Sequence, residues 1–231
     1  MKKIITLFTL VLLLSIATQS NAQWSWGLKS GLNIASFSYA TSTGMTIKSV
    51  TGYQVGGVVN YYLQNNMFLE AGIGLSTKGS EVSMGDASTM LIDSKIKPQY
   101  LEIPINFLYK VDLAEGAYLH LFAGPYLGFG LGGKVSSAVT LSGMSATTSD
   151  NSIIYGSDST ANMKSFDFGL NVGVGAELSR FFIRVQYGFG LTNLSPSSDA
   201  NSSFKNSCIG LSVGYMWGED SSKKTHRRRR R

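Results

Sequence analysis

The stretch DFGLNVGVGAELSRFFIRVQYGFG, residues 167–190, indicates the fold of this chain. Large apolar residues from Phe168 to Val174 occupy every second position, and glycine, Asp167, Asn171 and Glu177 occupy the positions that face the other way. The alternation resumes over residues 183–191, after Ser179-Arg180. A period of two residues places successive side chains on opposite faces of a strand, whereas a helix would repeat every 3.6 residues. The stretch therefore predicts two antiparallel strands joined by a tight turn.

Eight stretches of the chain alternate in this way, and their connections are alternately short and long. The stretches span residues 24–35, 53–61, 69–76, 101–110, 119–131, 166–177, 183–191 and 208–217. Tight turns are expected around Asn65-Asn66, residues 112–116 and Ser179-Arg180, and long polar loops over 38–50, 82–97, 133–164 and 193–203. Short turns on one side and long loops on the other are typical of outer-membrane barrels. We therefore predict an all-β fold, an eight-stranded antiparallel up-and-down transmembrane β-barrel.

The side chains of the polar face indicate which face is inside. A soluble ligand-binding barrel would point its large apolar residues inward, but here glycine and charged residues share one face along the predicted strands. An eight-stranded barrel has an interior just wide enough for side chains to fill it, so bulky polar residues there need small neighbours. We predict a polar lumen surrounded by lipid. A structural cluster of inward charges would consist of Lys29, Glu70, Glu102, Lys110, Asp167, Glu177 and Arg184.

Aromatic residues gather near the ends of the predicted strands, where a membrane barrel carries interfacial belts. The belt at the short-turn end is predicted to contain Trp24, Trp26, Tyr61, Tyr109, Phe181, Tyr215 and Trp217. The belt at the long-loop end would contain Phe37, Phe129, Phe166 and Phe189.

The first residues predict export from the cytoplasm. Lys2 and Lys3 precede an apolar stretch, residues 4–17, which is too short to span about 30 Å of hydrocarbon as a helix. Small residues at Ser20 and Ala22 fit a cleavage site. The predicted organisation is therefore a signal peptide over residues 1–22, a barrel over 23–218 and a basic periplasmic tail over 219–231. An even number of strands places both ends of the mature chain in the periplasm.

The net charge of +6 is a property of the ends of the chain. Nine of its 20 lysines and arginines lie in residues 1–22 or in the tail, which finishes with Arg227–Arg231. The body of the chain is nearly neutral, so no nucleic-acid partner is expected. Cys208 is the only cysteine, which excludes an internal disulfide, and we expect it to be buried.

No catalytic, cofactor-binding or metal-binding residue is predicted, and we do not expect an enzyme. The segment GFGLGGK, residues 128–134, has the glycine and lysine spacing of a phosphate-binding loop. Val135 replaces the Ser or Thr that would reach a metal, however, and the segment continues a strand rather than opening a helix. His120 is expected in the lumen beside a carboxylate, and His226 lies in the tail. One cysteine and two separated histidines cannot assemble a zinc site.

Four segments resemble the PorT-like outer-membrane β-barrel family of Bacteroidetes, over nearly all of residues 23–218. They are WGLKSGLNIASFS at 26–38, YLEIPINFLYK at 100–110, LFAGPYLGFGLGGK at 121–134 and DFGLNVGVGAELSRFFIRVQYGFGLTNL at 167–194. The resemblance implies an outer-membrane barrel of the OmpA/OmpX size class, and the family has no shared catalytic motif. The family's namesake is linked to type IX secretion, a role that the resemblance alone does not assign to this chain.

Two functions remain open from the sequence. The first is a structural or interaction protein whose lumen is filled by polar residues and glycine and whose long extracellular loops make surface contacts. The second is a small pore or an accessory component of protein secretion across the outer membrane. Expected partners are outer-membrane lipid and lipopolysaccharide, the barrel-assembly machinery, and a surface ligand bound through the loop at residues 133–164.

Overall fold

A computed structural model describes residues 23–39, 44–86, 88–141, 144–158, 160–197 and 203–218. The predicted signal peptide at 1–22 and the tail at 219–231 lie outside the described residues. No described residue belongs to a helix long and apolar enough to cross a membrane. The strands are β1 (Trp24–Tyr39), β2 (Met45–Gln64), β3 (Met67–Thr77), β4 (Ser80–Asp86), β5 (Met90–Ala114), β6 (Ala117–Leu141), β7 (Met144–Ser152), β8 (Phe166–Leu178), β9 (Phe181–Gly190) and β10 (Phe204–Gly218).

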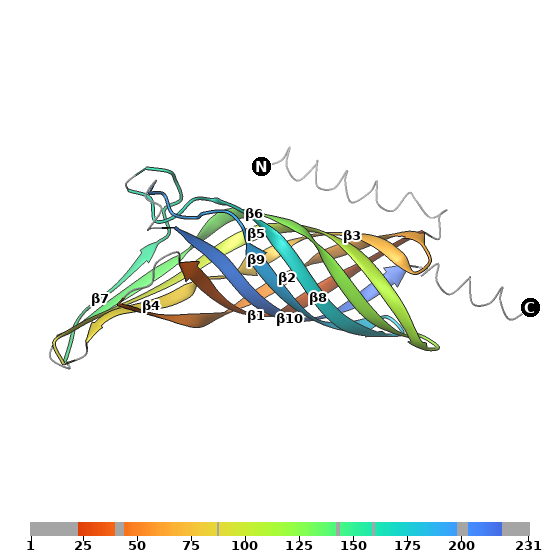
Figure 1. The fold of residues 1–231 in the computed structure, drawn as a ribbon, viewed down its shortest axis with the longest axis horizontal. Helices are drawn as coiled ribbons and strands as arrows, with labels where there is room; N and C mark the ends of the chain where they lie inside the picture. The colour runs from red at the N-terminus through yellow and green to blue at the C-terminus, as the bar shows by residue number, and fades with distance from the viewer. Residues whose placement is uncertain are drawn as a thin grey trace, which may run out of the picture.

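Eight of these strands form a closed ring, which confirms the predicted fold. Each is antiparallel to its neighbours in the order β1, β2, β3, β5, β6, β8, β9 and β10, and β10 pairs again with β1. The strands are strongly tilted against the long axis of the molecule (Figure 1). Closing the sheet leaves the ring without a free edge, and every backbone hydrogen bond within a membrane can be made between neighbouring strands.

The three predicted tight turns all lie at one end of the ring. Asn65 and Asn66 have φ angles of 47° and 64°, and Ser179 has a φ of 60°. Such positive φ values suit the two-residue turns that match the twist of a hairpin. Ser25 of β1 pairs with Gly218 of β10 at this same end.

The distribution of exposed side chains is the reverse of that in a soluble protein. Leu32 and Ile73 are 58% and 56% exposed, whereas Glu70 and Asp167 are 1% and 0% exposed. Exposing large apolar side chains to water is unfavourable, and so is burying carboxylates in an apolar interior. Both are favourable when lipid surrounds the ring and a polar lumen lies within it.

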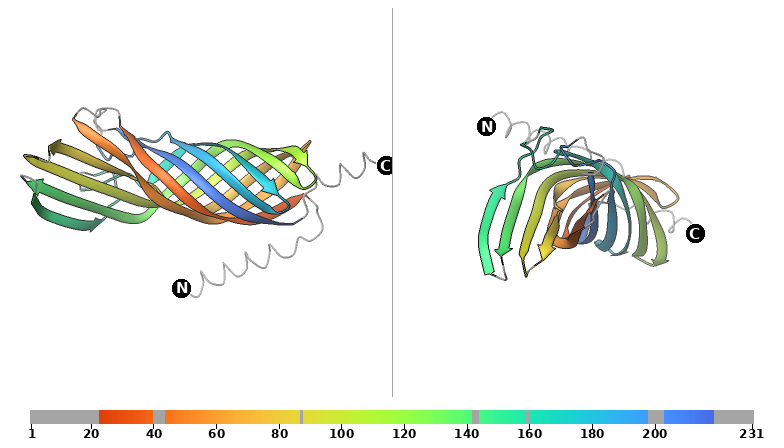
Figure 2. Two further views of the ribbon diagram at one scale, coloured as in Figure 1. Left: turned by 90° about the horizontal axis from the view of Figure 1, so that it is seen from below. Right: turned by 60° about the vertical axis from the view of Figure 1, so that its left-hand side comes forward.

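The long links differ from the sequence prediction, because much of three of them is strand. β4 and β7 are additional strands, and β2, β5 and β6 continue beyond the ring to pair with them. The result is a sheet in the order β2, β4, β5, β6, β7 that projects from the end opposite the tight turns (Figures 1 and 2). We call it the extension. The prediction of loops over 38–50, 82–97 and 133–164 was wrong because Ser- and Thr-rich segments lack the apolar face that identified the other strands, although threonine and valine favour extended structure.

Between β7 and β8 the chain folds over the mouth of the ring. Ile153 and Met163 from this segment, Leu194 from the β9–β10 link, and Phe37 and Tyr100 form one buried apolar cluster. Phe37 is only 2% exposed, so its predicted place in an outer aromatic belt was wrong: its side chain points inward under this segment. We call residues 153–164 the cap.

A local turn shapes the tip of the cap. The Oδ1 atom of Asp158 accepts hydrogen bonds from the hydroxyl of Thr160 at 2.7 Å and from the backbone N–H groups of Thr160 and Ala161 at 3.1 Å. These hydrogen bonds lower the pKa of Asp158, the hydroxyl of Thr160 being the main cause. The carboxylate therefore stays charged and keeps the turn closed at neutral pH.

Candidate functional site

The lumen collects all seven predicted inward charges, and each arrives there by the alternation of its strand. Lys29 lies on β1, Glu70 on β3, Glu102 and Lys110 on β5, Asp167 and Glu177 on β8, and Arg184 on β9. All except Lys29 are buried, with at most 9% of the residue exposed. They do not form one cluster but two networks at different heights.

The first network crosses five consecutive strands of the ring near the tight-turn end. Arg184 donates from Nη1 to both carboxylate oxygens of Glu70, at 2.9 and 2.7 Å, and from Nε to Nδ1 of His120 at 3.2 Å. Glu177 Oε2 lies 2.9 Å from both His120 Nε2 and Lys110 Nζ. Because Nδ1 of His120 accepts from Arg184, the ring hydrogen must sit on Nε2 and point at Glu177. The network is therefore a continuous chain of charged and polar partners with a neutral histidine at its centre.

The second network lies toward the capped mouth. Lys78 Nζ is 2.9 Å from Glu102 Oε2 and 3.4 Å from Asp167 Oδ2, and it sits 4.0 Å from the centre of the Tyr126 ring. Asp167 Oδ2 also accepts hydrogen bonds from the Tyr126 hydroxyl at 3.0 Å and from Asn206 Nδ2 at 2.8 Å. A buried carboxylate with three donors is compensated for much of its lost hydration.

Lys78 is the lumen residue that the sequence prediction missed. It lies between β3 and β4, where the strand is interrupted and Gly79 has a φ of 134°, so it belongs to no alternating run. The balance of charge among the predicted lumen residues nevertheless indicated that one base was missing. The seven predicted residues hold four acids and three bases, and a narrow lumen favours neutrality because an unpaired buried charge is strongly destabilising. Lys78 supplies the fourth base.

Lys29 lies between the two networks. It interacts electrostatically with Glu70 and Glu102, yet no carboxylate of the described residues comes within 4.0 Å of its ammonium group. A small cavity of about 20 Å³ beside it is also lined by Gln54, Ser76 and Glu102. That volume is room for about one water molecule.

Apolar side chains fill the rest of the lumen at the tight-turn end. Val58, Phe182 and Met216 form one buried cluster, and Phe68, Leu108 and Phe122 form another. The rings also face the cations of the first network: the Arg184 guanidinium lies 4.5 Å from the Phe182 ring centre and Lys110 Nζ lies 4.9 Å from that of Phe68. Such contacts further stabilise cations that are away from water.

The outer face carries the predicted aromatic residues at the tight-turn end. Ring centres are 4.7 Å apart for Trp24 and Tyr61, 4.6 Å for Trp26 and Trp217, and 4.8 Å for Phe181 and Tyr215. Tyr109 is 38% exposed and lies apart from this group, with no ring contact to another described aromatic residue.

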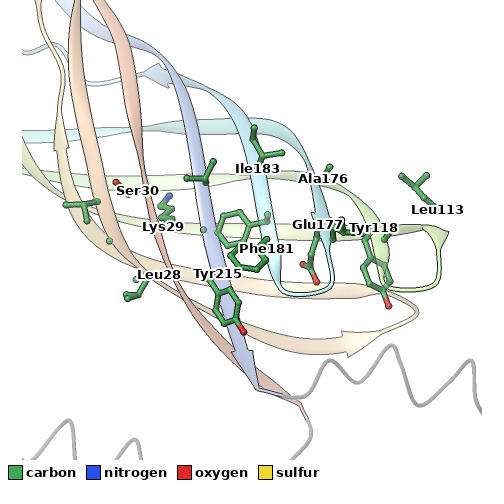
Figure 3. A pocket seen from close by; sticks show the side chains of 18 residues that line it. Leu28, Lys29, Ser30, Leu113, Tyr118, Ala176, Glu177, Phe181, Ile183 and Tyr215 are labelled. Atoms are coloured by element: carbon green, nitrogen blue, oxygen red, sulfur yellow. The ribbon is translucent and has the colours of Figure 1, made fainter.

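An apolar pocket of about 1020 Å³ lies at the tight-turn end of the ring. Its lining includes Leu28, Phe181 and Ile183, which are about half exposed or more, whereas inward residues of the same wall such as Phe182 are closed off at 3%. In Figure 3, Leu28 and Leu113 point away from the ring. Lys29, Glu177 and Phe182, which the fold directs toward the lumen, also line it, so the pocket touches both faces of this wall.

The described residues contain no group of three His, Cys, Asp or Glu side chains that could hold a metal ion. The segment at 128–134 continues β6 as a strand, and its glycines admit neighbouring side chains: a Cβ on Gly130 would lie 2.4 Å from the Tyr155 ring. Cys208 is buried, as expected.

Comparison with known proteins identifies the class of barrel. The chain matches a family model described as outer membrane protein beta-barrel domain over residues 17–195. No curated protein matches it. Among solved structures, it is similar to Ail, the attachment invasion locus protein of Yersinia pestis, with 12% identity, 84% of this chain and 99% of that chain covered, and a TM-score of 0.42. It is also similar to the outer membrane protein OprG of Pseudomonas aeruginosa, with 13% identity, coverage of 85% and 97%, and a TM-score of 0.40.

The matched residues span most of the chain, including nine of the ten described strands in full. They contain the inverted distribution of polar and apolar side chains described above. The chain therefore belongs to the outer membrane protein beta-barrel domain family and is a protein of the outer membrane.

Proposed function

We propose that this barrel is a plugged structural or surface-contact protein and does not conduct solutes. The observation that carries the proposal is that buried side chains occupy the lumen near both of its ends and between them. Apolar clusters and the first charge network lie toward the tight-turn end, the second charge network lies toward the mouth, and the cluster under the cap occupies the mouth. Four acids and four bases, with Lys78 included, make the filling electrically neutral.

The charge networks favour closure over conduction. A conducting pore needs polar groups that exchange partners with passing water or ions. Arg184 instead donates to Glu70 at 2.7 Å and to His120 at 3.2 Å, and all three residues are at most 3% exposed. Removing one partner would leave the other charge buried without a partner or water, which is strongly unfavourable, so the network resists opening.

We further propose that surface contact takes place on the extension. Residues 133–164, predicted as a ligand-binding loop, contribute the end of β6, all of β7 and the cap. The described residues 147–152 of β7 are exposed and carry four hydroxyl groups and the carboxylate of Asp150, and β7 pairs only with β6 among the described strands. A polar strand of this kind can offer side chains to a partner outside the cell.

The placement of the chain in the cell completes the proposal. Residues 1–22 would direct export, the tight turns and both ends of the mature chain would face the periplasm, and the barrel-assembly machinery would insert the ring into a bilayer of phospholipid and lipopolysaccharide. Membership of the PorT-like group of Bacteroidetes is supported by the four segments that resemble it.

Planar-bilayer recording tests the central claim. The purified full chain should insert without steady ion conductance, because the two buried networks and the apolar clusters obstruct the lumen. A Lys78→Ala, Glu102→Ala double variant should show brief channel openings, since it removes a neutral pair and leaves space. Steady channels in the unmodified protein that disappear on Glu102→Gln or Arg184→Gln substitution would instead establish a pore that uses these residues as its lining.

A further inference from the structure

The outer face of the extension carries two lysines that lie directly opposite each other. Lys97 of β5 and Lys134 of β6 are register partners. Ile96 and Val135, one position away on each strand, pack against the apolar cluster under the cap. Since successive side chains of a strand point to opposite faces, Lys97 and Lys134 face outward.

The like charges of this pair are not compensated by their surroundings. Gly79 lies beside Lys97 and offers no side chain, and Ser152 is the partner of Lys134 on β7. No carboxylate of the described residues lies within 4.0 Å of either ammonium group. Like charges directly opposite each other destabilise a sheet, so an unbalanced pair suggests that an external anion offsets the repulsion.

The described acids on the outer face of the extension lie farther from the ring. Glu81 pairs with Lys48 at 3.6 Å and with Lys95 at 3.4 Å, and Lys95 is two residues beyond Lys97 along β5. The nearest acidic residue on β7 is Asp150, opposite Ser136. Among the described residues, the charges on the outer face of the extension are therefore two lysines in the row next to the ring and mixed charges in the row above it.

The same two strands are apolar on their outer faces just below the lysines. Leu101 and Ile103 follow Lys97 on the outward side of β5, and Phe129 and Leu131, which are 42% and 58% exposed, precede Lys134 on β6. Lys97 and Lys134 are thus the first charged outward residues above the lipid-facing surface of β5 and β6. Lysines at this height reach the head groups of the adjacent leaflet.

We propose that Lys97 and Lys134 together bind a phosphate group of an outer-leaflet glycolipid, the lipid A portion of lipopolysaccharide. A phosphate placed between the two ammonium groups would neutralise both, and its acyl chains would lie along Leu101, Phe129 and Leu131. The inference rests on the proposed orientation, in which the extension is outside the cell. It concerns the outer face alone and is independent of whether the lumen conducts.

Binding of lipid A to the full chain in detergent micelles tests the site. A Lys97→Gln, Lys134→Gln double variant should bind bisphosphorylated lipid A about 25-fold more weakly than the unmodified protein, because each basic residue near an anionic surface contributes about fivefold. Both proteins should bind dephosphorylated lipid A equally. Raising the salt concentration should reduce the difference, since exposed charges are screened. Lys48→Gln is the matched control: it removes a lysine from the extension that already pairs with Glu81.

Three results would overturn the proposal. Equal affinity of the double variant and the unmodified protein for lipid A would exclude a role for the pair. An equal loss on Lys48→Gln would mean that general surface charge attracts the lipid. Inorganic phosphate that competes at the affinity of lipid A would identify a site for soluble anions. Conductance recorded on the same proteins reports separately on the plugged lumen.

Discussion

At the scale of single residues, the Arg184–Glu70 pair offers the sharpest test of the filled lumen. Arg184→Met should reduce the free energy of unfolding by about 3–5 kcal/mol, because it leaves the Glu70 carboxylate buried without its charge partner. Adding Glu70→Gln to that variant should restore part of the loss. Urea unfolding in lipid vesicles measures both. Lys48→Ala, at an ion pair whose lysine side chain is 57% exposed, should change stability by less than about 1 kcal/mol.

Alternation along the strands predicted which residues face the lumen, but it could not predict how they pair. Glu102 and Glu177 occupy equivalent positions in the sequence pattern, yet one binds Lys78 and the other binds Lys110 and His120. Which lumen side chains meet depends on the stagger between strands. That stagger is set by the hydrogen-bond register of strands that lie far apart in the sequence. Lys78 was missed for a related reason, since it enters the lumen at an interruption rather than on an alternating run.

At the scale of elements, the interruption between β3 and β4 is the feature to perturb. A Cβ on Gly79 would lie 2.0 Å from the backbone oxygen of Ile96, and its φ of 134° is unfavourable for any other residue. Gly79→Ala should lower the free energy of unfolding by about 1–3 kcal/mol and make β4 more sensitive to protease. Gly132→Ala is the control, because nothing lies within 4 Å of its added Cβ. Equal effects of the two substitutions would mean that the interruption is not strained.

The eight strands and three turns of the ring were predictable because lipid imposes an apolar outer face on every spanning strand. β4 and β7 escaped prediction because they stand above the lipid, where neither face is required to be apolar. Residues 147–152 of β7 are exposed and hydrophilic, so only pairing with β6 makes them a strand. The same freedom from lipid makes the extension the part of the molecule best suited to specific contacts.

At the scale of the whole molecule, the direction in which the barrel crosses the membrane decides where the extension acts. Thr148 on β7 and Glu115 in a tight turn are both exposed, and the native Cys208 is buried at 5% exposure, so it contributes little background labelling. In intact cells, a membrane-impermeant maleimide should label Thr148→Cys and leave Glu115→Cys unlabelled until the outer membrane is permeabilised. Labelling of Glu115→Cys alone in intact cells would reverse the proposed orientation. The phosphate site of Lys97 and Lys134 would then face the periplasmic leaflet, where lipid A is absent. That result would contradict the proposed lipid A site and leave the proposal of a plugged lumen unaffected.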